Sequence, residues 1–278
     1  MSQLLELRRT TPRYEGNGTI YPVAFAEDDP VFAGHFPGYP VLPASFLVDL
    51  CCDCLALSLG QDHLQDGEWC VARSVFSSPL RPGDRTEIMV SPGRDDAHRD
   101  IRVTCKGEVA ATLGLRRAEP ADVPALPIRD TADMVAAGPY LPQRFPLQAV
   151  DLLSTADDDN PEGHGRKLVS HADYFFRRAA TCAPSYPHGA VIEGIEQAAA
   201  TVLARQWDVT SEDNAIVIGG LNGIRFHGKA APGEVIDLIC AAEQISDDFA
   251  MLTGRAQVDS RALVTIDRII VIRKELNA

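Results

Sequence analysis

Two long apolar stretches dominate the pattern of hydrophobic and polar positions along the chain. The first lies within Asp29–Leu59 and the second within Asp173–Trp207, each after a loop rich in Pro and aromatic residues. Both stretches are long enough for several helical turns and are apolar on nearly all sides, which is typical of an enclosed helix rather than a surface helix. We therefore predict one long buried helix in each half of the chain.

Shorter runs follow each predicted helix after a Pro-Gly turn. They read RTEIMV, DIRVTC and EVAATLGL in the first half, and EVIDLIC, AMLTGRAQV and RALVTIDRIIVIR in the second. Runs of this length that are rich in β-branched residues and bounded by turn residues predict the strands of a meander. Each half is thus expected to be an α+β unit, an antiparallel sheet wrapped around its own helix.

The stretch Leu115–Thr131 has three prolines and no hydrophobic period. This composition predicts an extended linker between domains. We place the N-terminal domain at residues 1–118, the linker at residues 119–134 and the C-terminal domain at residues 135–278.

The two halves also repeat each other, weakly in identity but consistently in pattern. The aligned pairs are Phe32 with Phe176, Pro40 with Pro184, Pro43 with Pro187 and Asp49 with Glu193 at an offset of 144 residues, then Phe76 with Phe226 and Gly83 with Gly233 at an offset of 150 residues. We assign the six-residue difference to a loop insertion in the polar segment Asp208–Asn214, where insertions are best tolerated.

Composition narrows the class of protein. With 26 basic and 39 acidic residues the net charge is −13, which argues against a nucleic-acid partner. No window approaches a membrane span, and the first residues lack the pattern of a signal peptide. The seven cysteines are odd in number, and Cys51, Cys52 and Cys54 crowd one apolar stretch, so we predict reduced thiols packed in a helix and a cytoplasmic protein.

The segment Gly34–Asp49, GHFPGYPVLPASFLVD, resembles the signature GHFPGxPVMPG of the 3-hydroxyacyl-[acyl carrier protein] dehydratases. In that family a catalytic Glu or Asp follows the His by fourteen positions, as Asp49 follows His35. In the second half LPQRFPLQAVD is similar to the family's LPxRYPxLLVD, and EGIEQ is similar to its ExxAQ. The segment HGAVIE, residues 188–193, also resembles the dehydratase domains of polyketide synthases. The resemblance implies a double hot-dog fold, an intrachain pseudodimer that leaves a higher oligomer open.

Family members pair the His of one hot-dog with the acid of the other, so the resemblance implies two candidate sites in this chain. In the second half Ala179 stands at the His position, so its pairing with Asp49 is interpreted as a vestigial second site. His35 and Glu193 keep both reactive groups, together with the supporting Gln197. We therefore predict one working site per chain.

The predicted chemistry needs two proton-transfer groups and stabilisation of a developing oxyanion. A neutral imidazole suits the base, and a carboxylic acid kept protonated by an apolar helix suits the acid. Free N–H groups at a helix start stabilise the thioester oxygen, either near Ala44 or near His188 and Gly189. The predicted substrate-binding residues are Gly38, Pro43, His188, Gly189 and Gln197.

The resulting hypothesis is dehydration of a 3-hydroxyacyl thioester to the 2-enoyl thioester in fatty-acid or polyketide biosynthesis. The substrate would be presented on the phosphopantetheine of an acyl carrier protein, with no cofactor and no metal ion. Arg177 and Arg178 are candidate contacts for that acidic partner. Two alternatives stay open: a hot-dog thioesterase or enoyl isomerase, for which Glu193 alone suits hydrolysis, and a non-catalytic acyl-binding partner subunit, suggested by Ala179.

Overall fold

The computed structural model describes residues 10–36, 38–119, 123–127, 131–154, 162–176, 185–204, 207 and 214–275. The helices are α2 (Pro30–His35), α3 (Ala44–Ser58) and α4 (His188–Leu203), with short 3-10 turns at Thr131–Asp133, Gly138–Tyr140 and Tyr174–Phe176. The strands of the first half are β1 (Arg13–Glu15), β2 (Gly18–Ala24), β3 (Trp69–Phe76), β4 (Arg85–Pro92), β5 (His98–Cys105) and β6 (Glu108–Arg117). Those of the second half are β7 (Met134–Ala136), β8 (Leu152–Ser154), β9 (Glu162–Leu168), β10 (Asn214–Phe226), β11 (Val235–Ile245), β12 (Phe249–Val258) and β13 (Arg261–Glu275).

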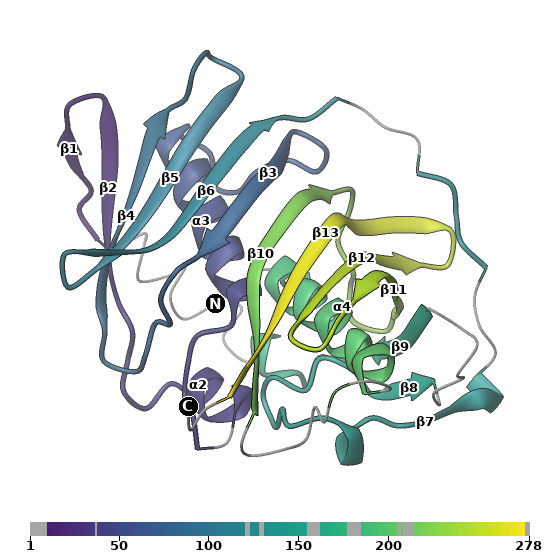
Figure 1. The fold of residues 1–278 in the computed structure, drawn as a ribbon. Helices are drawn as coiled ribbons and strands as arrows, with labels where there is room; N and C mark the ends of the chain where they lie inside the picture. The colour runs from purple at the N-terminus through teal and green to yellow at the C-terminus, as the bar shows by residue number, and fades with distance from the viewer. Residues whose placement is uncertain are drawn as a thin grey trace.

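The strands in the described part of the chain form one antiparallel sheet in the order β1-β2-β4-β5-β6-β3-β10-β13-β12-β11-β9-β8-β7. The order reads as two equivalent halves that meet where β3 pairs with β10. At this seam Val71 pairs with Ile224 and Cys70 with Arg225. Figure 1 shows the sheet curving from one half into the other. The prediction of a separate sheet for each half was therefore wrong in one respect, because the two sheets are continuous.

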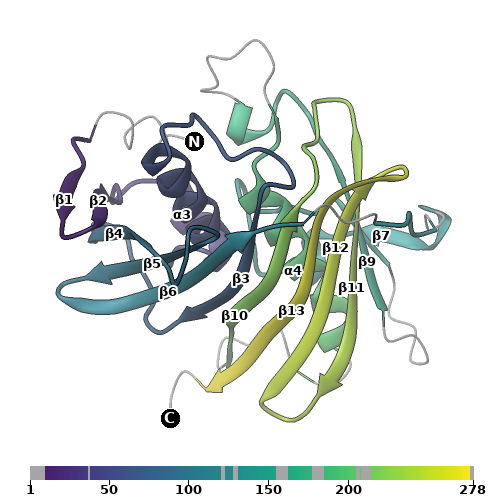
Figure 2. The same cartoon turned by 90° about the horizontal axis from the view of Figure 1, so that it is seen from above.

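Both predicted long helices are present, and each is enclosed by its half of the sheet, as Figures 1 and 2 show from two directions. Helix α4 packs against β9, β11 and β12, and also against α3 of the other half. The cysteines Cys51, Cys52 and Cys54 are buried in α3, as predicted. No helix within the described ranges is long and apolar enough to cross a membrane.

The structure confirms the register of the internal repeat. Pro43 and Pro187 are the N-cap residues of α3 and α4, with nearly the same backbone angles. Gly83 and Gly233 both have positive φ, 78° and 96°, in the turns that lead into β4 and β11. Only glycine adopts this backbone region at little cost, which explains why both halves keep it. The equivalent strands therefore occupy equivalent places on either side of the seam.

The structure corrects two sequence assignments. The first three residues of the proline-rich stretch Leu115–Thr131 belong to strand β6, which continues to Arg117, although the linker boundary placed at residue 119 lies beyond that strand. The loop expected before α3 contains a short helix, α2, whose N-cap Asp29 accepts a hydrogen bond from the N–H of Val31 at 3.0 Å. Pro30 occupies its first turn, where a missing N–H costs nothing. Most of the predicted insertion, residues 208–213, lies outside the described residues.

Candidate active site

His35 ends helix α2 and is buried, with 9% of its surface exposed. Its Nδ1 lies 2.9 Å from the carbonyl oxygen of Val41. A carbonyl oxygen can only accept, so Nδ1 carries the proton in this hydrogen bond and Nε2 keeps its lone pair. The Phe36 ring packs beside the imidazole at 4.2 Å between ring centroids. The imidazole is therefore fixed in the tautomer that leaves Nε2 able to take up a proton.

The protonation state of His35 follows from its surroundings. Burial lowers the pKa of the His35 imidazole below its ordinary value of 6.5, although the charge of Glu193 and the hydrogen bond to Val41 act in the opposite direction. Desolvation disfavours the charged form of an imidazole, which is why burial has this sign. The ring is consequently neutral at pH 7, as a base must be.

The position of His35 depends on a contact from the other half of the chain. The N–H of Arg144 donates to the carbonyl oxygen of Gly34 at 2.8 Å. A Cβ atom on Gly34 would lie 2.7 Å from the carbonyl oxygen of Arg144 and 3.0 Å from that of Phe145. The segment LPQRFP therefore lies directly against the residue before the histidine, and only glycine fits there.

Glu193 lies on α4, and only 2% of its surface is exposed. The hydroxyl of Ser45 on α3 donates to its Oε2 at 2.8 Å, and the side-chain amide of Gln197 donates to its Oε1 at 3.0 Å. The predicted apolar environment is thus only part of the picture, because two hydrogen-bond donors from different helices also hold the carboxyl group. Such donors fix the orientation of a buried carboxyl group.

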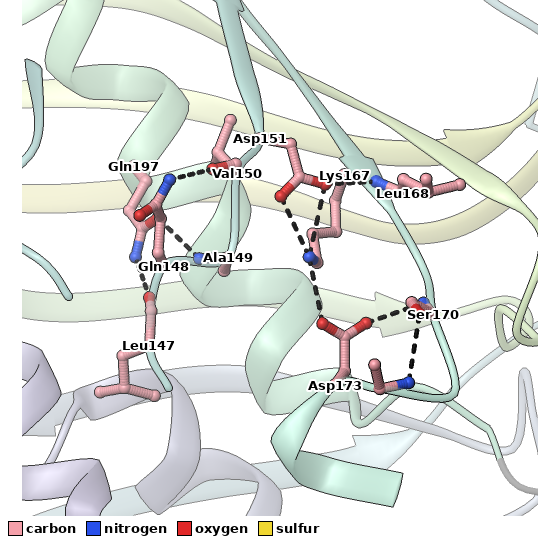
Figure 3. A network of polar contacts seen from close by, with 11 residues as sticks. Leu147, Gln148, Ala149, Val150, Asp151, Lys167, Leu168, Ser170, Asp173 and Gln197 are labelled. Atoms are coloured by element: carbon pink, nitrogen blue, oxygen red, sulfur yellow. Dashed lines mark hydrogen bonds and ion pairs between the residues drawn. The ribbon is translucent and has the colours of Figure 1, made fainter. Parts of the chain in front are cut away.

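Gln197 connects this carboxyl group to the segment that follows the contact with Gly34. Its Nε2 also donates to the carbonyl oxygen of Leu147 at 2.7 Å, and its Oε1 accepts from the N–H of Ala149 at 3.0 Å. Figure 3 shows Gln197 bridging from α4 to this extended segment. The side chain is buried and fully used, so its contacts support a positioning role for Glu193 and this segment.

His35 and Glu193 belong to different halves of the chain and act on each other electrostatically: the charge of Glu193 is one of the influences on the pKa of His35. The hydrogen bond from Ser45 places Glu193 at the start of α3, which follows the histidine loop. The arrangement joins a neutral base and a buried carboxyl group at one location, as proton transfer at two neighbouring atoms requires.

The equivalent position in the other half is arranged differently. Asp49 and Glu193 are each the sixth residue of their helix. Gly189 stands at the repeat position of Ser45, and a Cβ atom there would lie 3.1 Å from Cβ of Asp49. Asp49 consequently faces a glycine where Glu193 faces a serine hydroxyl. Ala179, the predicted partner of Asp49, lies outside the described residues, as do Arg177 and Arg178.

The remaining predicted residues have local contacts. Gly38, with a φ of 85°, lies in the turn that the N–H of Tyr39 closes by donating to the carbonyl oxygen of Phe36 at 3.0 Å. Nε2 of His188 lies 3.0 Å from the carbonyl oxygen of Gly228. The His188 ring also packs on Phe226 at 4.7 Å, so the end of β10 holds this imidazole.

Sequence reasoning missed two residues at this site, Ser45 and Glu196. Ser45 aligns with a glycine in the repeat, so comparing the halves gave no sign of it. Glu196 could have been found from its spacing, because an acid three positions after Glu193 lies on the same side of an apolar helix. Its Oε1 atom is buried and, within the described structure, has no hydrogen-bond donor.

Comparison of the sequence with protein families gives one consistent class. The ApeI-like model, described as ApeI dehydratase, matches residues 12–113. The 3-hydroxyacyl-[acyl-carrier-protein] dehydratase FabZ of Pseudothermotoga lettingae is 26% identical over 134 residues, which are 48% of this chain and 91% of the relative. FabZ of Albidiferax ferrireducens is 27% identical over 147 residues, 52% of this chain and 97% of the relative. Each relative thus matches about half of the chain.

Solved structures match the whole architecture. The dehydratase domain of PpsC from Mycobacterium tuberculosis superposes with a TM-score of 0.71 at 13% identity, covering 95% of this chain and 97% of that domain. The dehydratase domain from the CurJ module of the curacin polyketide synthase gives 0.71 at 9% identity, covering 96% of both chains. These matches establish the fold as the predicted double hot-dog, an α+β pseudodimer within one chain.

Proposed function

We propose that this protein is a dehydratase that converts a 3-hydroxyacyl thioester into the 2-enoyl thioester, with His35 as base and Glu193 as acid. The observation that carries the proposal is the buried pairing of a neutral imidazole, whose Nε2 is unprotonated, with a carboxyl group from the other half. The FabZ relatives and the fold shared with polyketide synthase dehydratase domains support the same reaction.

The proposed reaction balances with these two groups alone. Nε2 of His35 takes the proton from C2 of the substrate, and the electrons of that C–H bond form the C2–C3 double bond. The C3–O bond breaks, and its oxygen leaves as water with a proton delivered by Glu193. The imidazolium then returns its proton to the carboxyl group, which restores both residues. No cofactor enters any of these steps.

The geometry supports the start of α3 as the source of the oxyanion donors. The first N–H groups of a helix have no carbonyl partner one turn earlier, and the helix dipole is positive there. Ser45 places this helix start beside Glu193, whereas Gly189 places the start of α4 beside Asp49. Of the two sets left open by the sequence, this contact favours the N–H groups near Ala44 as the oxyanion donors of the proposed site.

We further propose an acyl carrier protein as the partner that presents the substrate on its phosphopantetheine arm. The names of the FabZ relatives support a carrier-bound substrate. A 3-hydroxyacyl group held on such an arm is long enough to enter a buried site while the carrier stays outside. The net charge of −13 then confines recognition of an acidic carrier to a local basic surface.

The test is incubation of the purified chain with 3-hydroxyacyl thioesters of several chain lengths, on carrier protein and on pantetheine, followed by mass spectrometry. Loss of one water from the acyl group, and its dependence on His35, is the expected result. Free acid released at a rate unaffected by His35→Ala would instead indicate a thioesterase. Bound but unchanged thioester at every chain length would indicate an acyl-binding subunit.

A further inference from the structure

Glu196 is a partly buried acid with a fully buried Oε1 atom, and the mechanism above does not use it. It lies one helical turn after Glu193 on α4, at the position where the ExxAQ pattern has alanine. Its carboxyl group contacts that of Glu193, and its Oε1 atom has no donor within the described residues. Contact between two carboxyl groups becomes a hydrogen bond only when one of them is protonated.

The surroundings of Glu196 offer little to stabilise a charge. Cys240 of β11 lies beside it, and burial raises the pKa of that thiol above its ordinary value, so the thiol stays neutral. Tyr186, ahead of α4, is buried on the side of Glu193, and burial raises the pKa of its phenol well above the ordinary value. Across the site, His35 is neutral at pH 7. Strand β12 approaches the helix closely at Gly254, which lies against Ile195.

The buried cation on β9, a strand that packs against α4, is already neutralised. Lys167 of β9 is buried, and its ammonium group lies 3.2 Å from Asp151 and 3.3 Å from Asp173. Figure 3 shows Lys167 held between these two carboxylates. On α3, Asp49 adds another acidic group near the start of α4, at Gly189. Burial, together with the charge of Glu193 and the contact with it, raises the pKa of the Glu196 carboxyl well above its ordinary value.

We propose that Glu193 and Glu196 share one proton, and that this proton is the one delivered to the leaving oxygen. This inference rests on the proposed function. Ser45 and Gln197 donate hydrogen bonds to Glu193, whereas Oε1 of Glu196 has no donor among the described residues, so Glu196 is the member of the pair that holds the proton at rest. Two buried carboxyl groups in contact do not both ionise at neutral pH, because like charges repel strongly there.

The shared proton explains how the site can protonate the leaving oxygen and then accept the proton taken from C2. When the C3–O bond breaks, Glu193 gives the proton to the departing oxygen and both carboxyl groups are left ionised. The proton taken from C2 by His35 then returns to the pair, which removes the charge repulsion and restores the starting state. Glu196 does not touch the reacting atoms in this scheme. It is a positioning residue for the proton. As long as Glu196 holds the proton, the pair can deliver it through Glu193 at neutral pH.

The experiment compares wild type with Glu196→Ala, Glu196→Gln and the control Glu243→Gln, a change at an exposed acid on β11. Dehydration of a 3-hydroxyacyl pantetheine thioester is followed from pH 5 to pH 9. We expect the alkaline limb of kcat to move to lower pH in both Glu196 variants, with about a tenfold loss of rate for each pH unit of the shift. The control should follow the wild-type profile. Profiles of both Glu196 variants that superimpose on wild type would overturn the inference.

A second measurement does not depend on turnover, and its main observation needs only the wild-type chain. Infrared spectroscopy of the wild-type chain at neutral pH should show the C=O band of a buried protonated carboxyl group, and Glu196→Gln should remove it while Glu243→Gln keeps it. Absence of this band in wild type would overturn the shared proton. If the band is present but no thioester is dehydrated, the proposed function fails and the proton-sharing pair stands.

Discussion

Ser45 of α3 donates its hydroxyl proton to Oε2 of Glu193 on α4 over 2.8 Å, although 148 residues separate them in the chain. The first half thus holds the acid of the second, just as LPQRFP of the second half holds the glycine beside the histidine of the first. Each reactive residue depends on the half that does not carry it.

Removal of either reactive group should abolish turnover. His35→Ala deletes the base and Glu193→Gln deletes the acid, and each change should lower kcat at least about a hundredfold, the usual contribution of one acid or base. The assay is the rate of water loss from a 3-hydroxyacyl thioester. Asp49→Asn is the matched control and should keep nearly full activity. A loss with Asp49→Asn as large as that with Glu193→Gln would move the acid to the first half.

Removal of the Ser45 hydroxyl should slow the reaction without unfolding the chain. A hydrogen bond to a charged group contributes about 1.5–3 kcal/mol, so Ser45→Ala is expected to lower kcat about tenfold to a hundredfold. Ser58→Ala is the control on the same helix, because the Ser58 hydroxyl bonds only the carbonyl oxygen of Leu55 near the helix end. Equal rates for the two variants would show that Glu193 is positioned without Ser45.

The acid limb of the pH profile should report His35. The pKa of His35 in the folded chain lies below 6.5 because of burial, so the active neutral form persists below that pH and is lost only as the pH falls through the lowered pKa. The plot of kcat/KM against pH should therefore reach half of its plateau below pH 6.5. Half-saturation at or above pH 6.5 would contradict the burial of a neutral imidazole. NMR titration of the His35 signal, assigned with His35→Gln, is the independent check.

Gly34→Ala should disturb both stability and activity. The added Cβ would lie 2.7 Å from the carbonyl oxygen of Arg144, and overpacking of this kind costs about 1–3 kcal/mol. The free energy of unfolding from urea titration measures the cost, and kcat shows whether His35 has moved. Gly114→Ala is the control, because a Cβ there meets only Oδ1 of Asp100, at 3.9 Å. If Gly34→Ala keeps the wild-type stability and rate, the segment LPQRFP can shift to make room for the added Cβ atom, and the contact does not fix the position of His35.

Ser74→Ala should weaken the seam between the halves. The Ser74 hydroxyl donates to the carbonyl oxygen of Leu221 and accepts from its N–H, both at 2.8 Å, and the site is buried. Its removal leaves two buried backbone groups unpaired, which costs about 1–3 kcal/mol for each group. Urea unfolding checks the loss, with Ser91→Ala as control at an exposed hydroxyl. If Ser74→Ala lowers the free energy of unfolding no more than Ser91→Ala does, the seam does not depend on the Ser74 side chain.

From the sequence it was possible to predict the features that show in the local hydrophobic pattern or in the internal repeat. The long helices, their proline caps and the turn glycines Gly83 and Gly233 were all predicted, because each leaves a local mark in both halves. The continuous sheet was missed, since the pairing of Val71 with Ile224 joins distant strands and has no periodic signal. Helix α2 was read as a loop because its six residues are too few to show a helical period, although Asp29 and Pro30 gave a start signal.

At the site, the sequence identified the reactive residues more readily than the residues that contact them. The family resemblance predicted the pairing of His35 with Glu193, and in the structure the charge of Glu193 acts on the buried His35 imidazole. Ser45 was hidden because a serine in an apolar helix has no distinctive pattern, and its value depends on which side chain it faces. Glu196 was passed over because acids on helices are usually solvated, and only its burial shows otherwise.

The covalent link between the two halves, through the segment between β6 and β7, has a consequence for how such a site can diverge. In an assembly of two identical chains every substitution appears twice, so a serine at one helix start and a glycine at the other cannot coexist. Within a single chain the two equivalent positions can mutate independently. Here one of them is Ser45 and the other is Gly189. The tether also makes the assembly of the two halves independent of protein concentration, so the folded site persists at dilutions that would separate a dimer of two chains.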